Sequence, residues 1–196
     1  MRIFGAVLAG GEARRMGRVD KAFVQFLGRP LIAHVLERLE PQVETVLISA
    51  NGDAARFQGF GCKVVPDARP QGPLSGVLAC LTRAAQMGAT HLVTVPVDTP
   101  FLPGDLVPQL LLASESAPQG LAMARDDERD HPATAIWPVA LVASLTDYLA
   151  AGGAKVTGFT KAHGVVVADF PDPRAFLNLN TLKDLAQAEA RLRGTA

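Results

Sequence analysis

The stretch RIFGAVLAGG, residues 2 to 11, decides the fold class of this chain. Residues 3–9 form a continuous apolar run that stops at a pair of glycines. A short strand of this kind is typical of a parallel sheet covered by helices, because both of its faces are then buried. The stretch therefore predicts a buried first strand with a loop at its carboxyl end.

The rest of the first half alternates strand-like and helix-like segments. Further strand-like segments lie at 43–51, 62–65 and 91–97, and apolar residues at helical spacing lie in 31–39 and 77–87. This alternation predicts a mostly parallel central sheet between helical layers. The expected fold is a Rossmann-like three-layer α/β sandwich.

The second half is less regular. The expected helices and strands span residues 106–113, 121–125, 133–139, 142–149 and 165–169. A last helix should follow Thr181, which Asp184 would join in a variant capping box. Because no repeat or flexible linker divides the 196 residues, we expect one domain over residues 1–196, with a more variable C-terminal half.

Composition excludes several classes of protein. With 19 basic and 19 acidic residues, the formal net charge is zero, so neither nucleic acid nor an anionic membrane is an expected partner. The sequence has no apolar run of about 20 residues and no signal-peptide pattern. Two cysteines, Cys62 and Cys80, are typical of a reduced protein, and we expect a cytoplasmic location.

The loop after the first strand is rich in glycine and positive charge. It contains Gly10 and Gly11, and its cations are Arg14, Arg15, Arg18 and Lys21. Glycines let a ligand approach the backbone, and the cations can neutralise phosphate. However, the spacing matches neither the common phosphate loop nor the dinucleotide fingerprint. The pattern leaves two interpretations open, an anion-binding loop and a solvated surface turn.

Carboxylates follow two other strands. Asp98 comes directly after the strand at 91–97 and could ligate Mg²⁺, although an Asx turn or helix cap is the simpler role. Asp67, which follows the strand-like segment 62–65, has the same two possible roles, as a metal ligand or in a turn or cap. Since ligands of open α/β sheets bind beyond the carboxyl ends of the strands, we expect the glycine-rich loop, residues 49–51 and Asp98 to share one site.

The remaining candidates narrow the chemistry. The four histidines show no zinc spacing, and no Ser-His-Asp or Cys-His arrangement is evident. His34 and His91 are expected to be structural, whereas His131 stays open because it lies in the charged, loop-like run 125–131. Glycines, cations and a strand-end carboxylate suit phosphoryl or nucleotidyl transfer, which needs positioning and charge stabilisation rather than a protein nucleophile.

Six stretches across nearly the whole chain resemble the molybdenum cofactor guanylyltransferases. These MobA-type proteins belong to the wider superfamily of nucleotide-diphospho-sugar transferase-like nucleotidyltransferases. The stretches are LAGGEARRMGRVDKA at 8–22, GRPLIAHVLERL at 28–39, GPLSG at 72–76, PVDTPFLP at 96–103, RDHPA at 129–133 and FLNLNT at 176–181. The first and fourth are shared broadly with other nucleotidyltransferases, and the last two point to this branch.

The resemblance implies an activity. GMP would pass from GTP to the terminal phosphate of molybdenum-molybdopterin, with Mg²⁺ as cofactor and pyrophosphate as the second product. Residues 1–100 would then be the nucleotide-binding half of the domain, and residues 101–196 the molybdopterin-binding half. Transient contact with proteins that mature molybdoenzymes is compatible with this role.

The resemblance also implies roles for individual residues. Lys21, Arg15 and Asp98 would serve catalysis, with Arg15 and Lys21 on the phosphates and Asp98 on Mg²⁺. The nucleotide side would comprise Leu8, Ala9, Gly10, Gly11, Lys21, Asn51, Asp67 and Asp98. The pterin side would comprise His131, Asn178 and Asn180. One position departs from the family, because Ser49 stands where an asparagine is frequent. Serine is shorter, so a contact from position 49 to the nucleotide is in doubt.

Three rival functions remain at this stage. A cytidylyltransferase that uses CTP with molybdopterin and a sugar-phosphate nucleotidyltransferase would share both the loop and Asp98. The segments RDHPA and NLN favour the molybdopterin branch. A non-catalytic nucleotide-binding protein is the rival from another class, although it has no need for the cationic loop, Asp98 and the asparagine pair together.

Overall fold

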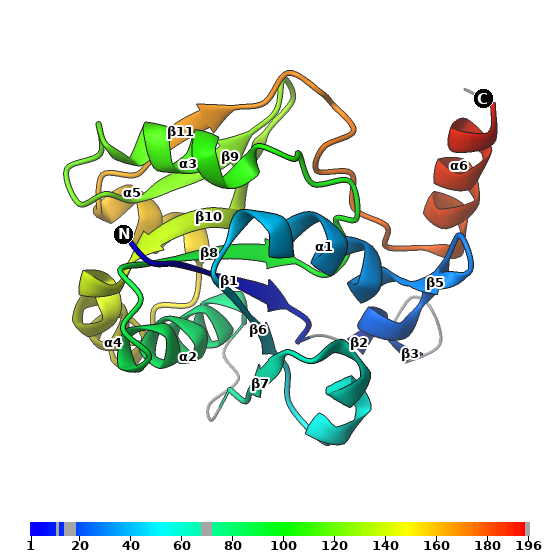
Figure 1. The fold of residues 1–196 in the computed structure, drawn as a ribbon. Helices are drawn as coiled ribbons and strands as arrows, with labels where there is room; N and C mark the ends of the chain where they lie inside the picture. The colour runs from blue at the N-terminus through cyan, green and yellow to red at the C-terminus, as the bar shows by residue number, and fades with distance from the viewer. Residues whose placement is uncertain (11, 14–18, 68–71, 195–196) are drawn as a thin grey trace.

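The computed structural model describes residues 1–10, 12–13, 19–67 and 72–194 (Figure 1). Its centre is a seven-stranded sheet in the order β11-β9-β10-β8-β1-β6-β7. The strands are β1 (Ile3–Leu8), β6 (Thr45–Ser49), β7 (Lys63–Val65), β8 (His91–Pro96), β9 (Ala122–Arg125), β10 (Asp130–Pro138) and β11 (Val166–Asp169). Only β10 runs antiparallel to its neighbours in this sheet, so the sheet is mostly parallel, as predicted.

Helices cover both faces of the sheet (Figure 1). One apolar core joins the sheet to α1 (Leu31–Leu39) and α3 (Leu106–Ser114). A second core joins the other face to α2 (Pro73–Gln86), α4 (Val142–Ala150) and α5 (Val156–Ala162). The central strand β1 is buried at four consecutive positions between these cores, as a strand covered on both faces must be. The three-layer α/β sandwich is confirmed.

Smaller elements lie outside the seven-stranded sheet and the helices that cover it. They are β2 (Glu12–Ala13) paired with β3 (Val19–Asp20), the 3₁₀ turn η2 (Lys21–Phe23), β4 (Gln25–Phe26) paired with β5 (Arg29–Pro30), η3 (Glu40–Gln42), η4 (Ala54–Phe60), η5 (Val139–Leu141) and α6 (Leu182–Arg193). In Figure 1, α6 stands beside the β4–β5 hairpin, away from the helical layers. A third apolar cluster, centred on Phe26, Leu31 and Leu185, joins the hairpin to α6.

Three local predictions were wrong. Helix α2 begins at Pro73 rather than Val77, because Gly72, at a φ of 88°, turns the chain before a proline that suits a first helical turn. Helix α5 was missed, since its seven residues bury only Phe159 and Thr160 and leave too short a periodic pattern. His131 lies in β10 rather than in a loop. The register of β10 against β9 shifts between His131 and Ala135, and a bulge of this kind accommodates a proline in a strand.

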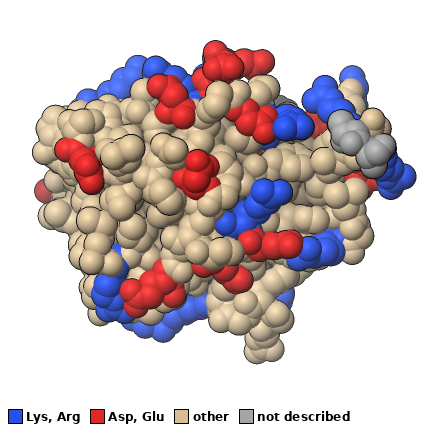
Figure 2. Space-filling view, turned by 45° about the horizontal axis from the view of Figure 1, so that its top comes forward, with Lys and Arg blue, Asp and Glu red and all other residues tan. Residues whose placement is uncertain are grey.

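The surface matches the balanced composition. On the face in Figure 2, acidic and basic side chains are interspersed among uncharged residues. Among the residues that the structure describes, no helix combines the length and apolar character needed to cross a membrane.

The close packing of α1 on β1 can be tested at Gly5. A Cβ atom there would lie 2.9 Å from Cδ2 of Leu39 and 3.2 Å from Cγ2 of Val43. We expect Gly5→Ala to lower the free energy of unfolding by about 1–3 kcal/mol, because overpacking forces neighbours out of position. Urea denaturation measures it, with Gly104→Ala as control, since a Cβ at Gly104 meets no described atom within 4 Å. Equal stability of the two variants would contradict the packing.

Candidate functional site

The carboxyl ends of four parallel strands meet at one edge of the sheet. The register pairs Leu8 of β1 with Ser49 of β6 and with Pro96 of β8, and Ser49 with Val65 of β7. Backbone hydrogen bonds continue past the strand ends, from Ala9 N–H to the Ser49 carbonyl at 2.9 Å. The loops that follow these strands are therefore neighbours, as the sequence predicted.

Three side chains from distant parts of the chain meet at this edge. The Lys21 ammonium group donates hydrogen bonds to the Asp98 carboxylate and to the side-chain carbonyl of Asn180. The Lys21 and Asp98 side chains are only 17% and 13% exposed. The Leu179 N–H donates to the Asp98 carbonyl at 2.9 Å, which ties the segment before α6 to the end of β8. The structure thus joins Lys21, Asp98 and Asn180 into one cluster, which we call the lysine cluster.

The start of α6 orients Asn180. Asp184 accepts hydrogen bonds from the N–H groups of Asn180 at 3.0 Å and Thr181 at 2.8 Å, and its own N–H donates to the Thr181 hydroxyl at 3.1 Å. This reciprocal capping box was predicted, and it fixes the backbone that carries Asn180. Burial raises the pKa of Asp184, but hydrogen bonds from Thr181 and Asn180 outweigh it and leave the pKa below its ordinary value.

A second polar cluster lies on the side of β6 and β7. Asn51 accepts the N–H of Asp67 through its side-chain oxygen at 2.7 Å. The Ser75 hydroxyl, in the first turn of α2, donates to the Asp67 carboxylate and lies 2.8 Å from the Gly72 carbonyl. Two predicted nucleotide-side residues are thereby joined to each other and to the start of a helix.

Sequence reasoning missed Arg56 in η4. Its Nε donates to Asp20 at 2.9 Å, Nη1 to the Asp53 carbonyl at 2.6 Å, and Nη2 to the Asn51 carbonyl at 2.7 Å. The guanidinium carbon lies 4.6 Å from the centroid of the Phe57 ring. An arginine shortly after a strand-end asparagine was the only signal in the sequence, and it does not indicate a partner in another loop.

His131 is buried and paired rather than part of a solvated loop. Its Nε2 lies 2.7 Å from the Asp126 carboxylate, and its ring lies 4.6 Å from that of Phe176. Burial raises the pKa of Asp126, but hydrogen bonds from His131 and from backbone N–H groups bring it below its ordinary value. Through Phe176, His131 reaches the segment that carries Asn178 and Asn180. Asn178 is half-buried on that segment.

Some of the remaining predicted site residues lie within the described part of the chain, and others lie outside it. Leu8, Ala9 and Gly10 lie at the end of β1, and a Cβ on Gly10 would meet no described atom within 4 Å. Gly11 and Arg15 lie outside the described residues, as do Arg14 and Arg18.

Ser49 faces the protein interior. It is 4% exposed, and a Cβ on Gly76 would come within 2.6 Å of its hydroxyl oxygen. Burial raises the pKa of the Cys80 thiol, a hydrogen-bond partner of Ser49, to about 12. The packing of Ser49 against α2 explains why the side chain at position 49 is short.

The lysine cluster contains oxygen atoms of the kind that bind magnesium. Oxygens of Asp98 and Asn180 converge on one cationic group, and both are hard ligands. No group of three His, Cys, Asp or Glu residues could hold a metal among the described residues. An open pair of oxygens suits Mg²⁺, which usually binds one or two carboxylates together with substrate phosphates and water. The residues present therefore fit this ion.

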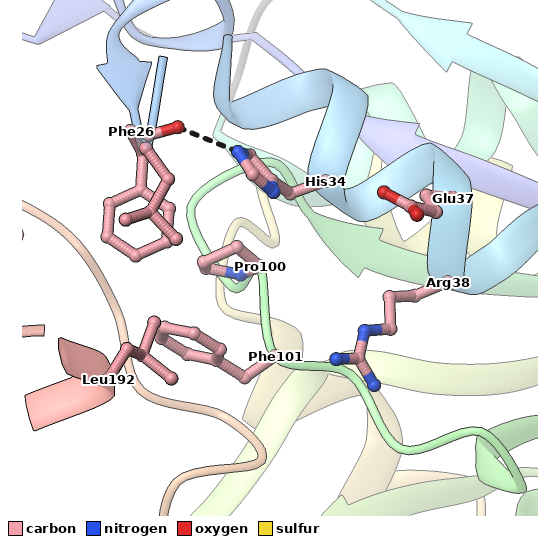
Figure 3. Close-up of a pocket in the computed structure, with 8 residues that line it drawn as sticks. Phe26, His34, Glu37, Arg38, Pro100, Phe101 and Leu192 are labelled. Atoms are coloured by element: carbon pink, nitrogen blue, oxygen red, sulfur yellow. Dashed lines mark hydrogen bonds between the residues drawn. The ribbon is translucent and has the colours of Figure 1, made fainter. Parts of the chain in front are cut away.

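A pocket of about 350 Å³ lies between the β4–β5 hairpin, α1 and α6 (Figure 3). Its lining consists of Phe26, Leu27, His34, Glu37, Arg38, Pro100, Phe101 and Leu192. The His34 ring nitrogen Nε2 lies 2.8 Å from the Phe26 carbonyl, and the Phe26 and Phe101 rings meet edge to face at 5.7 Å. This pocket contains no member of the lysine cluster. Its aromatic residues brace the hairpin and the loop after Asp98.

A lysine, a carboxylate and an amide gathered beyond the strand ends of a mostly parallel sheet suit nucleotidyl transfer, which needs charge stabilisation rather than a protein nucleophile. The family model described as the MobA-like NTP transferase domain matches residues 5–167. The chain belongs to this family.

Individual relatives agree with this assignment. A molybdenum cofactor guanylyltransferase of Cereibacter sphaeroides is 58% identical over 196 residues, which cover the whole of both chains. Two solved structures share the fold. Molybdopterin-guanine dinucleotide biosynthesis protein A from Archaeoglobus fulgidus has a TM-score of 0.78 at 23% identity, over 97% of this chain and 99% of that one. 4-Diphosphocytidyl-2C-methyl-D-erythritol synthase from Anaerococcus prevotii has a TM-score of 0.77 at 12% identity, over 98% and 96%.

The capping box can be tested through its dependence on pH. Because the folded-state pKa of Asp184 is lowered, its contribution to stability is present above the unfolded-state pKa and is lost as the pH falls through the folded value. We expect Asp184→Ala to lower the free energy of unfolding by about 1 kcal/mol at neutral pH. The difference from wild type should shrink on acidification to about pH 3.

Denaturation across this pH range measures the effect. Asp147→Ala, which removes a carboxylate from an exposed position of α4, is the control variant. A difference between Asp184→Ala and wild type that stays constant with pH would contradict the role of the carboxylate.

Proposed function

We propose that the protein transfers GMP from GTP to the phosphate of molybdenum-molybdopterin, forming the guanine dinucleotide cofactor and pyrophosphate. The lysine cluster carries this proposal, because it joins Lys21, from the segment after β1, and the strand-end Asp98 to Asn180 of the C-terminal segment. Relatives named for this guanylyltransferase activity, identical at more than half of all positions, support it.

The two substrates would occupy opposite sides of the lysine cluster. Residues 1–100, with the backbone of Leu8, Ala9, Gly10 and Gly11 and the Asn51–Asp67 pair, would hold the nucleotide. Residues 101–196, with Asn178, Asn180 and His131, would hold the molybdopterin. Continuity of the seven-stranded sheet through both halves supports a single domain with two substrate-binding halves.

The reaction is an in-line displacement at the α-phosphorus of GTP. A phosphate oxygen of molybdopterin attacks, a new phosphorus–oxygen bond forms, and the bond to the β-phosphate breaks with release of pyrophosphate. Lys21 and Arg15 hold the triphosphate and stabilise the negative charge that builds on the leaving group. The backbone of Gly10 and Gly11 provides further hydrogen-bond donors to the phosphates.

Asp98 would hold Mg²⁺, together with the side-chain oxygen of Asn180. When bound, the ion supplies positive charge that neutralises the reacting phosphates and orients them. Lys21 neutralises Asp98 in the structure, so it would exchange this carboxylate for the phosphates of the nucleotide. The same proposal includes GTP and molybdenum-molybdopterin as substrates and a cytoplasmic location. It also includes transient contacts with molybdoenzyme maturation proteins and no nucleic-acid or membrane partner.

The base preference is tested by offering GTP, CTP, ATP and UTP separately with Mg²⁺ and molybdenum-molybdopterin. We expect pyrophosphate release with GTP at least tenfold faster than with CTP, a difference of about 1.4 kcal/mol in transition-state binding. Faster release with CTP would establish a cytidylyltransferase instead. Nucleotide binding without pyrophosphate release would establish a non-catalytic binding protein.

Asp98→Asn should abolish transfer and leave the fold intact, because the amide keeps the shape of the carboxylate and loses its charge. Mn²⁺ binding in the presence of GTP, followed by electron paramagnetic resonance, should be lost as well. Wild-type turnover in this variant would exclude the metal-binding role. Circular dichroism serves as the control for folding.

Lys21→Ala should behave differently. It leaves Asp98 in place, so Mn²⁺ binding should persist while kcat falls roughly 100- to 1,000-fold, the usual cost of losing one preorganised charge-stabilising donor. A rate within threefold of wild type would contradict the assigned role.

A further inference from the structure

We infer that Arg56 is a positioning residue of this site: it fixes the loop after β6 to Asp20 and thereby sets the position of Lys21 relative to Asn51. The inference rests on the proposed function for its substrate, GTP. Arg56 is not among the site residues that the sequence predicted.

The contacts of Arg56 bridge two loops that are far apart in the chain. Toward one loop, the guanidinium donates to the carbonyls of Asn51 and Asp53. Toward the other, it donates to the carboxylate of Asp20, 36 residues away in sequence. The planar fork of arginine can satisfy three acceptors in fixed directions, which a lysine ammonium group on a flexible stem cannot reproduce.

Asp20 passes this connection to Lys21. One carboxylate oxygen of Asp20 accepts from Arg56, and the other accepts from the N–H of Ala22 at 3.1 Å. The Asp20 side chain therefore caps the 3₁₀ turn that begins at Lys21. Fixing this turn fixes the direction from which Lys21 enters the lysine cluster.

On its other side, Arg56 reaches the Asn51–Asp67 cluster. Asn51 offers its main-chain carbonyl to Arg56 and its side-chain oxygen to the N–H of Asp67. A continuous series of hydrogen bonds thus runs from Asp20 through Arg56 and Asn51 to Asp67. It connects the two sides of the bound nucleotide in the proposed function, the phosphates at Lys21 and the residues beyond β6 and β7.

The contacts of Arg56 orient the two loops more than they stabilise the folded protein. The Arg56 and Asp20 side chains are 29% and 31% exposed, and ion pairs at that exposure add little to stability. A bridge that orients two loops acts instead on ligand affinity, since a misplaced binding group loses most of its contribution. Loss of Arg56 should therefore affect GTP binding more than the free energy of unfolding.

The test compares Arg56→Met with a matched control, Arg2→Met. Arg2 also bridges a carboxylate and a carbonyl, those of Glu44 and Met87, but it precedes β1 at the opposite end of the strand. GTP affinity is measured by calorimetry with Mg²⁺ and without molybdopterin, so that no turnover is required. We expect Arg56→Met to weaken GTP binding about tenfold, equal to about 1.4 kcal/mol, and Arg2→Met to change it less than twofold.

Two further variants separate a positioning role from a general loss of structure or charge. Arg56→Lys should stay weakened, because it retains the charge but cannot bridge both loops. Arg56→Met should reduce GTP affinity by a smaller factor in a Lys21→Ala background than in the wild-type protein, because part of its effect on affinity acts through Lys21.

The outcomes are distinct. Equal GTP affinities of Arg56→Met and Arg2→Met, full affinity in Arg56→Lys, or additive effects with Lys21→Ala would each overturn the inference. Failure of the wild-type protein to bind GTP would overturn both the inference and the proposed function. GTP binding without pyrophosphate release would overturn the proposed function alone, and the comparison of affinities would still decide the role of Arg56.

Discussion

The site depends on one electrostatic interaction, that of the Lys21 ammonium group with the oxygens of Asp98 and Asn180. A largely buried cation needs such partners, because an isolated charge at this depth would be costly to desolvate. In the proposed function, the same two oxygens would hold Mg²⁺ when the phosphates of the nucleotide draw Lys21 away. One cation would then replace another, and Asp98 would not be left unpaired.

The fold explains how these groups come together. A parallel sheet places the ends of β1, β6, β7 and β8 at one edge, and the loops beyond them supply the polar groups. The second half adds a helix, α6, outside the layers. Its capping box presents Asn180, while the aromatic contacts of Phe26 and Phe101 brace the neighbouring hairpin and loop. Rigid elements thus position each group, as precise charge stabilisation requires.

The sequence predicted what local patterns encode. The continuous apolar run 3–9 and the strand-end position of Asp98 led to the parallel sheet and to the edge that carries the site. The capping box of Thr181 and Asp184 was also evident, because its residues are close in sequence. The partners of Lys21 could not be predicted from spacing, and neither could the bridge that Arg56 makes. His131 was misplaced because charged neighbours resemble a loop, whereas a buried carboxylate, Asp126, stabilises the histidine inside a strand.

The distances along the chain within the lysine cluster have a consequence for folding. Lys21 is separated from Asp98 by 77 residues and from Asn180 by 159. Contacts between such distant positions close large loops, and their entropic cost is met only after the sheet has assembled. The cluster should therefore be among the last parts of the protein to order. Since Asn180 is held at the start of α6, which stands outside the helical layers, local opening of that helix would dismantle the cluster while leaving the sheet folded.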